Sequence, residues 1–387
     1  MSRPLKICAV SSCRADYGLL VPILRLLRDD PRFVLQLVLT GQHLSGGANA
    51  TAARVRADGF DVAAEIETGL SGDDDAVAIT KTAARGLDGM ADVLARLKPD
   101  LMLLLGDRYE IAVVAVAATI ARLPIAHVFG GDVTQGAFDD AFRHSISKMS
   151  HLHFATNEDS ARRLRQLGEQ PEHIHVTGSP GLDLIRNTPV PSREAFFAAV
   201  NLAPKAINLA VTFHPETLAA ATVEHLDELL AALDQLGPDV AILFTGSNAD
   251  PEARQIEARI EAFVAGKPSR RLVGSLGAER YFAALTYVDA VVGNSSSGLY
   301  EAPSFGIPTV NIGDRQTGRL KAESVIDCRP DRASIVAAIK AALVRGRKPT
   351  INPYGDGFAA ARIVEELARF GELNSLLVKR FVDLEVA

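Results

Sequence analysis

The chain alternates short apolar runs with longer amphipathic stretches from one end to the other. In the first half, the apolar or β-branched runs lie at 6–12, 34–41, 101–107, 125–131 and 152–157. Helical patterns lie between them, the clearest at 18–28 and 73–97. Strands that are apolar almost throughout are typical of a parallel sheet covered on both faces. The series therefore predicts βαβ units and a doubly wound sheet.

The second half shows the same alternation of apolar runs and helical patterns. Further strands are expected at 174–179, 208–214, 240–247, 270–276, 290–295 and 309–314, with helices at 217–236, 251–265 and 278–287. The join is expected near 167–173, where the segment LGEQPEH is polar and contains a proline. We therefore predict an α/β protein with a Rossmann-like domain over 1–170, a second over 171–365, and a C-terminal helix within 366–387.

Composition and charge narrow the class of protein. With 387 residues, 48% hydrophobic and 23% charged, the chain is an ordinary globular protein of two-domain length. The net charge is −6 and the basic residues are scattered, which excludes an electrostatic footprint for nucleic acid or an anionic membrane. The three cysteines (Cys8, Cys13 and Cys328) form no CxxC motif, and the N-terminus lacks a signal-like apolar region. We expect a soluble, cytoplasmic protein.

Polar clusters follow the predicted strands directly, which is where ligands bind in doubly wound sheets. The clusters are SSCRADYG, GDRYE, GGDVTQGAFDD, FHPET, GNSSSG and GDRQ. No strict GxGxxG or GxxxxGK[ST] motif is present, which argues against dinucleotide and triphosphate sites of those kinds. The histidines show no metal-binding spacing, so we predict no catalytic metal.

Several of these clusters can hold an anion. Arg14, Arg108 and Arg315 each follow a strand end, an arrangement that suits a divided phosphate site, for example for a diphosphate. The hydroxyls of GNSSSG precede a predicted helix, although a simple serine cap is an alternative. Glu301 follows about one turn later and could receive a sugar diol. His214 is either structural or a phosphate donor or proton carrier.

The acid–base candidates are four carboxylates: Asp107, Asp132, Asp139 and Asp140. Carboxylates gathered near cations can have their pKa values driven apart, as acid–base catalysis requires. Two simpler interpretations remain open. Asp107 could cap the helix that begins near Arg108, and Asp139 could form an i,i+4 surface ion pair with a nearby arginine.

Seven collinear motifs resemble the hydrolysing UDP-N-acetylglucosamine 2-epimerases of sialic acid and related nonulosonic acid pathways, over nearly the whole chain. They are SCRADYGLLVPIL (12–24), LTGQHLS (39–45), LLLGDRYE (103–110), HVFGGDVTQGAFDDAFRHSISKMSHLHF (127–154), FHPET (213–217), VVGNSSSGLYEAPSFGIPTVNIGDRQTGR (291–319) and VIDC (325–328). The resemblance implies two Rossmann-like domains of glycosyltransferase-B type, the ligand in the interdomain cleft, and a C-terminal helix that crosses back to the first domain.

The resemblance also implies an activity and a set of site residues. UDP would leave by anti elimination to a 2-acetamidoglucal, and hydration would give the free 2-epimer, N-acetylmannosamine for the commonest substrate, with no cofactor. A homodimer or homotetramer through the first domain is also implied. The implied nucleotide-binding residues are Arg14, Arg108, His214, Asn248, Ser295, Ser296, Glu301 and Arg315. The implied catalytic residues are Asp107, Asp132, Asp139 and Asp140, with Arg143 and His144 in the adjoining motif.

One departure leaves the sugar open. Family members commonly carry glutamate where this chain has Asp132, and the shorter side chain withdraws the carboxylate by about one C–C bond. A 2,4-diacetamido-2,4,6-trideoxyhexose linked to UDP or GDP is therefore an alternative substrate. Two different functions also fit the motifs, namely a glycosyltransferase of the same fold and a non-catalytic sensor of sugar nucleotides.

Overall fold

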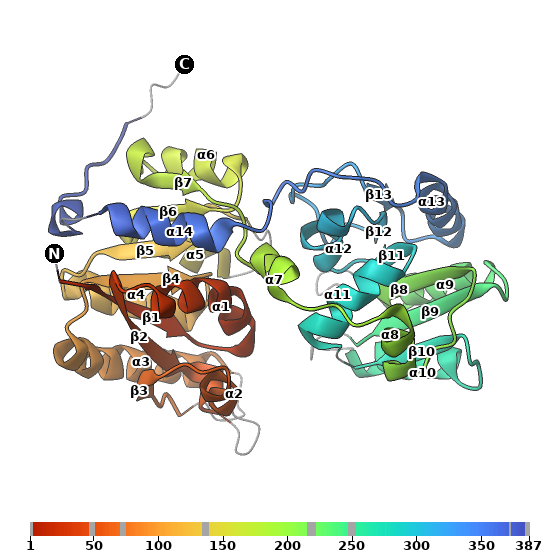
Figure 1. The fold of residues 1–387 in the computed structure, drawn as a ribbon, viewed down its shortest axis with the longest axis horizontal. Helices are drawn as coiled ribbons and strands as arrows, with labels where there is room; N and C mark the ends of the chain where they lie inside the picture. The colour runs from red at the N-terminus through yellow and green to blue at the C-terminus, as the bar shows by residue number, and fades with distance from the viewer. Residues whose placement is uncertain are drawn as a thin grey trace. The chain divides into compact units, whose positions relative to one another are not determined.

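A computed structural model describes residues 3–45, 51–69, 75–133, 139–214, 222–246, 253–274, 276–370 and 373–383. The chain divides into two compact units. The first comprises residues 1–183 together with 354–387, and the second comprises 184–353. Figure 1 shows the last part of the chain, in blue, returning to the elements of the first unit. No helix within the described ranges has both the length and the apolar composition needed to span a membrane.

The first unit is built on a parallel sheet of seven strands in the order β3-β2-β1-β4-β5-β6-β7. The strands are β1 (Leu5–Ser11), β2 (Phe33–Thr40), β3 (Val62–Ile66), β4 (Leu101–Leu105), β5 (Ile125–Val128), β6 (Leu152–Ala155) and β7 (Ile174–Val176). The order reverses between β1 and β4, so the carboxyl ends of these two strands lie at a topological switch point, where such sheets bind ligands.

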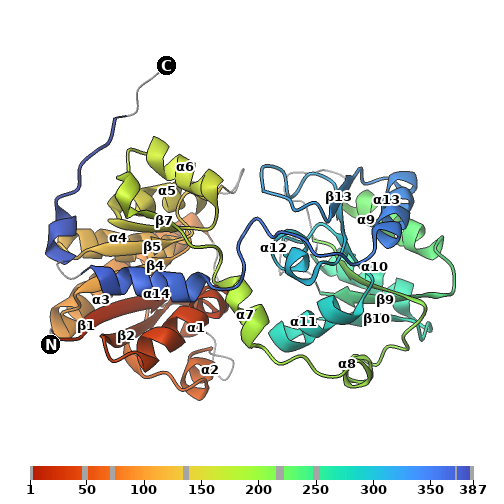
Figure 2. The ribbon, with the colours of Figure 1, turned by 45° about the horizontal axis from the view of Figure 1, so that its top comes forward.

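Helices cover both faces of this sheet. They are α1 (Arg14–Asp29), α2 (Ala52–Ala57), α3 (Ala76–Leu97), α4 (Tyr109–Ile120), α5 (Asp139–Met149), α6 (Glu158–Gln166), α7 (Gly181–Asn187), which continues into the second unit, and α14 (Ala359–Arg369). One apolar core joins α1, α2 and α14 to the sheet, a second joins α3, α4 and α5, and a smaller one joins α6. Figures 1 and 2 show α14 lying along α1.

The returning helix α14 is capped by a residue from another part of the chain. The Asp183 carboxylate accepts hydrogen bonds from the backbone N–H groups of Ala359 and Ala360, both at 3.0 Å. These donors belong to the first helical turn, where they have no partner within the helix. The helix begins earlier than the predicted segment 366–387, of which residues 373–377 form only a short 3-10 helix, η5 (Leu373–Leu377).

The predicted join at 167–173 is wrong, and so is the assignment of 174–179 to the second half. β7 is the edge strand of the first sheet, and the first unit extends to Asp183. The polar segment is not a linker, because Glu169 is 1% exposed and forms ion pairs with Lys148 and Lys379. A charged sequence can thus be internal when its partners come from distant parts of the chain.

The second unit contains a parallel sheet in the order β10-β9-β8-β11-β12-β13. Its strands are β8 (Ile207–Thr212), β9 (Val240–Thr245), β10 (Arg270–Val273), β11 (Ala290–Gly293), β12 (Thr309–Ile312) and β13 (Val325–Cys328). Its helices are α8 (Arg193–Ala199), α9 (Thr222–Asp234), α10 (Ala253–Val264), α11 (Gly277–Tyr287), α12 (Ser297–Tyr300) and α13 (Arg332–Arg345). The predicted pair of doubly wound parallel α/β domains is confirmed.

Candidate active site

One arginine gathers most of the predicted catalytic residues in the first unit. Arg143 lies on α5 and is 6% exposed. Its guanidinium donates to the Asp107 carboxylate, to Asp140 Oδ1 at 3.1 Å and to the backbone oxygen of Asp132 at 3.0 Å. A planar guanidinium can hold several acceptors in a fixed arrangement. The turn after β4, the segment after β5 and the first turn of α5 are therefore linked through a single side chain.

Asp107 does not cap the helix that follows it. The cap position of α4 is Arg108, which makes no side-chain capping bond, whereas the Asp107 carboxylate turns to Arg143. The capping alternative is therefore wrong. Arg108 instead donates to Glu110 from Nη2 at 2.9 Å and from Nε at 3.2 Å. Asp107 is an ion-paired carboxylate at the switch point of the sheet.

The Asp132 carboxylate is buried and held by hydroxyl groups. Its Oδ1 accepts hydrogen bonds from Thr156 Oγ1 at 2.7 Å and from Ser160 Oγ at 2.5 Å. Burial raises the pKa of Asp132 above its ordinary value, and the two hydroxyls only partly oppose this. Gly131 precedes it with φ of +78°, and a Cβ there would clash with the backbone oxygen of Ser160. The backbone at this point is thus fixed against α6, and the carboxyl is enclosed beside hydroxyl groups.

Asp139 and Asp140 begin α5 and differ in environment. Burial, and next the negative charge of Asp107, raise the pKa of Asp139. Asp140 pairs with Arg143 and approaches His144, whose Nε2 lies 3.6 Å from Asp140 Oδ2. Neighbouring carboxylates held in unlike environments are what acid–base catalysis requires.

Two carboxylates that the sequence did not single out also belong to this region. Asp16 is 8% exposed and accepts from Ser12 Oγ at 2.5 Å, and Glu110 is 3% exposed and pairs with Arg108. Their position in the sequence could have identified them as site candidates, because both lie in the motifs that follow β1 and β4. Arg14, in contrast, is an exposed residue at the start of α1.

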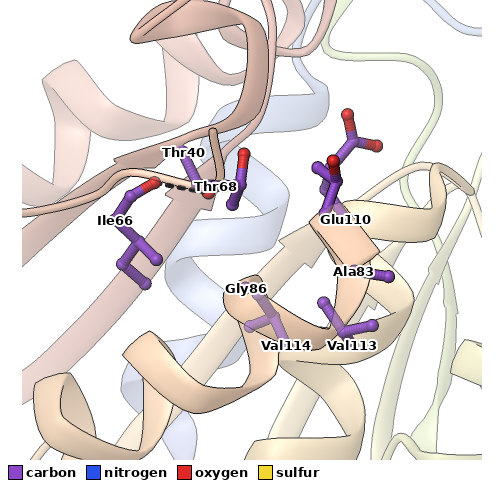
Figure 3. A pocket seen from close by; sticks show the side chains of 9 residues that line it. Thr40, Ile66, Thr68, Ala83, Gly86, Glu110, Val113 and Val114 are labelled. Atoms are coloured by element: carbon purple, nitrogen blue, oxygen red, sulfur yellow. Dashed lines mark hydrogen bonds between the residues drawn. The ribbon is translucent and has the colours of Figure 1, made fainter. Parts of the chain in front are cut away.

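A small pocket lies behind Glu110, between the ends of β2 and β3 and the helices α3 and α4 (Figure 3). Three threonines and apolar side chains line it, and Thr40 Oγ1 donates to the backbone oxygen of Ile66 at 3.1 Å. None of the predicted site residues is part of this lining. The pocket therefore lies within the packing of the first unit, and Glu110 is the one carboxylate that lines it.

In the second unit, Asn294 organises the carboxyl ends of β8 and β11. Its side chain accepts from the backbone N–H of His214 at 2.7 Å and donates to the backbone oxygen of His214 at 2.9 Å. Its own backbone oxygen accepts from Gln316 at 2.8 Å and from Arg315 at 3.2 Å. Asn294 thus joins the ends of three predicted strands. The sequence did not identify this residue, because its position after a glycine does not indicate which groups it bonds to.

The serine cluster forms a hydroxyl chain, and Ser295 Oγ also accepts from the backbone N–H of Ser297, the first residue of α12, at 3.5 Å. Ser296 occupies the cap position of α12, which is only four residues long, and makes no side-chain capping bond. Instead, Tyr281 donates to Ser297 Oγ at 2.5 Å, and Ser297 donates to Ser295 Oγ at 3.2 Å. The serine-cap alternative is therefore wrong for Ser296, and the chain of hydroxyls leads to Ser295.

Glu301 carries an unused acceptor. Its Oε2 is enclosed and has no hydrogen-bond partner among the described residues. Burial raises the pKa of Glu301 from 4.5 to about 7. An enclosed carboxylate oxygen without a donor is unfavourable in its charged form, which is the physical cause of the raised pKa.

Some predicted residues lie outside the described ranges. They are Asn248, the residues 215–217 of FHPET, and 134–138 of the segment after β5. Within the part of the chain that the structure covers, no three histidine, cysteine or carboxylate side chains gather as metal ligands.

Known proteins resemble this chain over most of its length. Residues 25–368 match the family model described as UDP-N-acetylglucosamine 2-epimerase. A Campylobacter jejuni protein named GDP/UDP-N,N'-diacetylbacillosamine 2-epimerase (hydrolyzing) is 35% identical over 83% of this chain and 84% of its own. The polysialic acid biosynthesis protein P7 of Escherichia coli is 32% identical over 98% of this chain and 97% of its own.

The fold has close counterparts among solved structures. One is the Neisseria meningitidis UDP-GlcNAc 2-epimerase bound to UDP-GlcNAc, with a TM-score of 0.77 at 17% identity over 94% of this chain and 99% of that one. At this identity the likeness concerns the fold alone.

Proposed function

The chain belongs to the UDP-N-acetylglucosamine 2-epimerase family of enzymes, and we propose that it is a hydrolysing 2-epimerase that releases UDP and the free 2-epimer from UDP-N-acetylglucosamine. The observation that carries this proposal is the cluster in which Arg143 holds Asp107, Asp140 and the backbone of Asp132 together. Such a cluster supplies several carboxylates in different environments, as a two-step reaction at adjacent carbons needs.

The chemistry explains why several groups are required. The C2 proton of an N-acetylhexosamine is not acidic, so direct removal would be slow. If the C1–O bond to UDP breaks first, the oxocarbenium-like centre makes the neighbouring proton removable. The enzyme then needs hydrogen-bond donors on the departing diphosphate, a base near C2, and an acid or base that guides water onto the glycal.

The described residues fit these roles. We assign the nucleotide to the second unit, with Glu301 accepting from the ribose hydroxyls, and Ser295 and Arg315 as diphosphate donors. His214, whose backbone is fixed by Asn294, is a further phosphate donor.

We assign the proton transfers to carboxylates of the first unit. Asp107, which is ion-paired with Arg143, is the candidate base, and Asp132, whose pKa is raised by burial, is the candidate acid. Asp139, whose pKa is also raised, and Asp140 are the candidates for guiding water. Arg143 holds this set, and His144 adjoins Asp140.

A second substrate is favoured by a specific observation. Asp132 stands where related enzymes commonly carry glutamate, and its short side chain is matched to the hydroxyls of Thr156 and Ser160. The Campylobacter jejuni relative is named for a diacetylated sugar nucleotide. A UDP- or GDP-linked 2,4-diacetamido-2,4,6-trideoxyglucose is therefore the alternative substrate, in a route to a nonulosonic acid other than sialic acid.

Proton NMR of the purified protein in D₂O, without metal or acceptor, tests the proposal. With UDP-N-acetylglucosamine we expect stoichiometric UDP and free N-acetylmannosamine carrying deuterium at C2. Turnover of the diacetamido nucleotides alone would assign the alternative sugar. Transfer only when an acceptor is added would indicate a glycosyltransferase, and UDP binding without any turnover would indicate a sensor.

We also propose that the protein is a cytoplasmic homodimer or homotetramer. The support is the resemblance of its motifs to the hydrolysing epimerases. Light scattering of the purified protein measures its mass directly, and a monomer at micromolar concentration would contradict the proposed assembly.

A further inference from the structure

A fully buried histidine lies directly behind the catalytic cluster. His127 is in β5, is 0% exposed, and uses both ring nitrogens. Its Nε2 is 2.8 Å from the backbone oxygen of Gly106, and its Nδ1 is 3.1 Å from Ser147 Oγ. Both partners belong to segments that carry candidate catalytic residues.

These contacts define the protonation of the ring. A carbonyl oxygen only accepts, so Nε2 must carry the hydrogen and donate to Gly106. Nδ1 then accepts from the Ser147 hydroxyl. Burial lowers the pKa of His127 to about 3, so the imidazole is neutral under ordinary conditions. His127 is therefore a fixed bridge with one donor and one acceptor, not a proton carrier.

The two partners lead directly to the carboxylate cluster. Gly106 immediately precedes Asp107 in the turn after β4. Ser147 lies on α5 one turn after Arg143, which pairs with that same Asp107. The turn and the helix are thus joined twice, once by the ion pair at the surface of the site and once by the imidazole beneath it.

The space around the imidazole is filled. A Cβ placed on Gly130 would approach Ser147 Oγ to 2.9 Å and His127 Nδ1 to 3.1 Å. A larger residue at 130 would therefore push the hydroxyl and the ring apart. This gives a physical reason for glycine at position 130, the first of the GG pair after β5. The catalytic roles proposed above do not explain that glycine.

We propose that His127 is a positioning residue for the epimerase reaction, an inference that rests on the proposed function. It holds the Asp107 turn and the Arg143 helix in register, so that the base and the groups that guide water keep their spacing. Its ring is enclosed by the protein, so it acts through these segments and not on the substrate. Misplacements of about 1 Å at such a site can cost on the order of a hundredfold in rate.

The test uses variants that each keep one of the two bonds. In His127→Asn the amide oxygen can replace Nδ1 and accept from Ser147, and in His127→Gln the amide nitrogen can replace Nε2 and donate to Gly106. His127→Leu keeps neither. We expect kcat to fall about tenfold in the first two and about a hundredfold in the third, with KM within about twofold of the wild type.

His153→Gln is the matched control. His153 lies beside His127 on the neighbouring strand β6 and is also fully buried, but its Nε2 bonds to Glu169 at 2.8 Å. We expect this variant to lose a similar amount of thermal stability and to retain kcat. An equal fall in kcat in His153→Gln would mean that any disturbance of this sheet lowers the rate, and it would overturn the specific role of His127.

Two readouts do not depend on turnover. Hydrogen exchange of the amides at 106–110 and 143–149 should accelerate in the His127 variants and not in the control. Nitrogen-15 NMR of the wild type should show a neutral His127 with hydrogen on Nε2 from pH 5 to pH 9. Unchanged exchange at these amides, a titrating imidazole, or an unchanged kcat in folded His127→Asn and His127→Gln would each overturn the proposal.

The proposed function can fail separately. A wild type that turns over neither UDP-N-acetylglucosamine nor the diacetamido nucleotides would refute the epimerase activity. In that case, hydrogen exchange of the amides at 106–110 and 143–149 would by itself test whether His127 holds these two segments together.

Discussion

Replacing Glu301 with glutamine should make the ligand-free protein more stable at pH 8.5 and its nucleotide binding weaker. In the native protein Oε2 is enclosed and has no donor among the described residues, and the pKa of the carboxyl is raised from 4.5 to about 7 by burial. Because the folded state holds the proton more tightly, this carboxyl costs nothing below pH 4.5. Its cost grows between pH 4.5 and pH 7 and is fully developed above pH 7.

The size of the cost follows from the two pKa values. A pKa raised from 4.5 to about 7 corresponds to about 3 kcal/mol of stability lost at pH 8.5, since a tenfold change in the ionisation constant is about 1.4 kcal/mol. Glutamine carries no charge, but its buried amide group costs about 1–2 kcal/mol if it lacks a partner. We expect a net gain of about 1–2 kcal/mol at pH 8.5 and a net loss of about 1–2 kcal/mol at pH 4.5.

Nucleotide binding should change in the opposite direction. A hydrogen bond from a ribose hydroxyl to a charged carboxylate contributes about 1.5–3 kcal/mol. Its loss should weaken UDP binding by roughly ten- to a hundredfold. A carboxyl with a purely structural role would not combine higher stability with weaker binding.

Calorimetry at pH 4.5 and pH 8.5 and titration with UDP provide the two measurements. A gain of about 1–2 kcal/mol should raise the melting temperature of a unit of this size by about 2–8 °C at pH 8.5. Glu323→Gln is the control, because the Glu323 side chain is 73% exposed and its replacement should change little. A lower melting temperature for Glu301→Gln at pH 8.5, or unchanged UDP affinity, would refute the reasoning.

Three further predictions concern single contacts. Arg143→Lys keeps the charge but cannot bridge the Asp107 turn to α5, so steady-state kinetics should show a fall of about a hundredfold in kcat and a smaller change in KM. Asn294→Leu removes both bonds to the His214 backbone, which should cost about 1–3 kcal/mol of stability by calorimetry and about tenfold in UDP affinity. Lys379→Met leaves the buried Glu169 with one cation fewer, which should cost about 1–3 kcal/mol in urea unfolding at pH 7. Although burial opposes it, the hydrogen bonds from His153 and Lys379 lower the pKa of Glu169 to about 2, so the deficit of Lys379→Met should shrink as the pH falls below 4.5.

The central strands were predictable from the sequence because both of their faces are covered. β4 and β5 are buried at every position, and such continuous apolar runs stand out. β3 and β13 were missed because they are edge strands with partly exposed positions, VAAEI and VIDC. β7 was assigned to the wrong domain because the polar segment before it has the composition of a linker.

The location of the candidate site could be predicted, but not its pairings. Parallel strands bring their carboxyl ends to one edge, so the positions of Asp107 and Asp132 followed from the strand pattern alone. The ion pair between Asp107 and Arg143 could not be predicted from the sequence. The two residues are far apart in the chain, and Asp139 offered Arg143 a nearby i,i+4 partner. Local spacing predicts contacts within an element, and contacts between elements depend on how helices pack on the sheet.

Burial decides which of the polar residues near the strand ends have a structural role and which remain available for chemistry. His127 and Asn294 are enclosed and have every polar side-chain group bonded to the protein, so they fix the backbone around the site. Glu301 is equally shielded at Oε2 but has no partner there among the described residues, which is unfavourable unless a ligand completes it. Composition cannot separate these cases, because the same residue types serve both purposes. Which polar atoms are enclosed, and which of them have partners, can be recognised only once the fold is known.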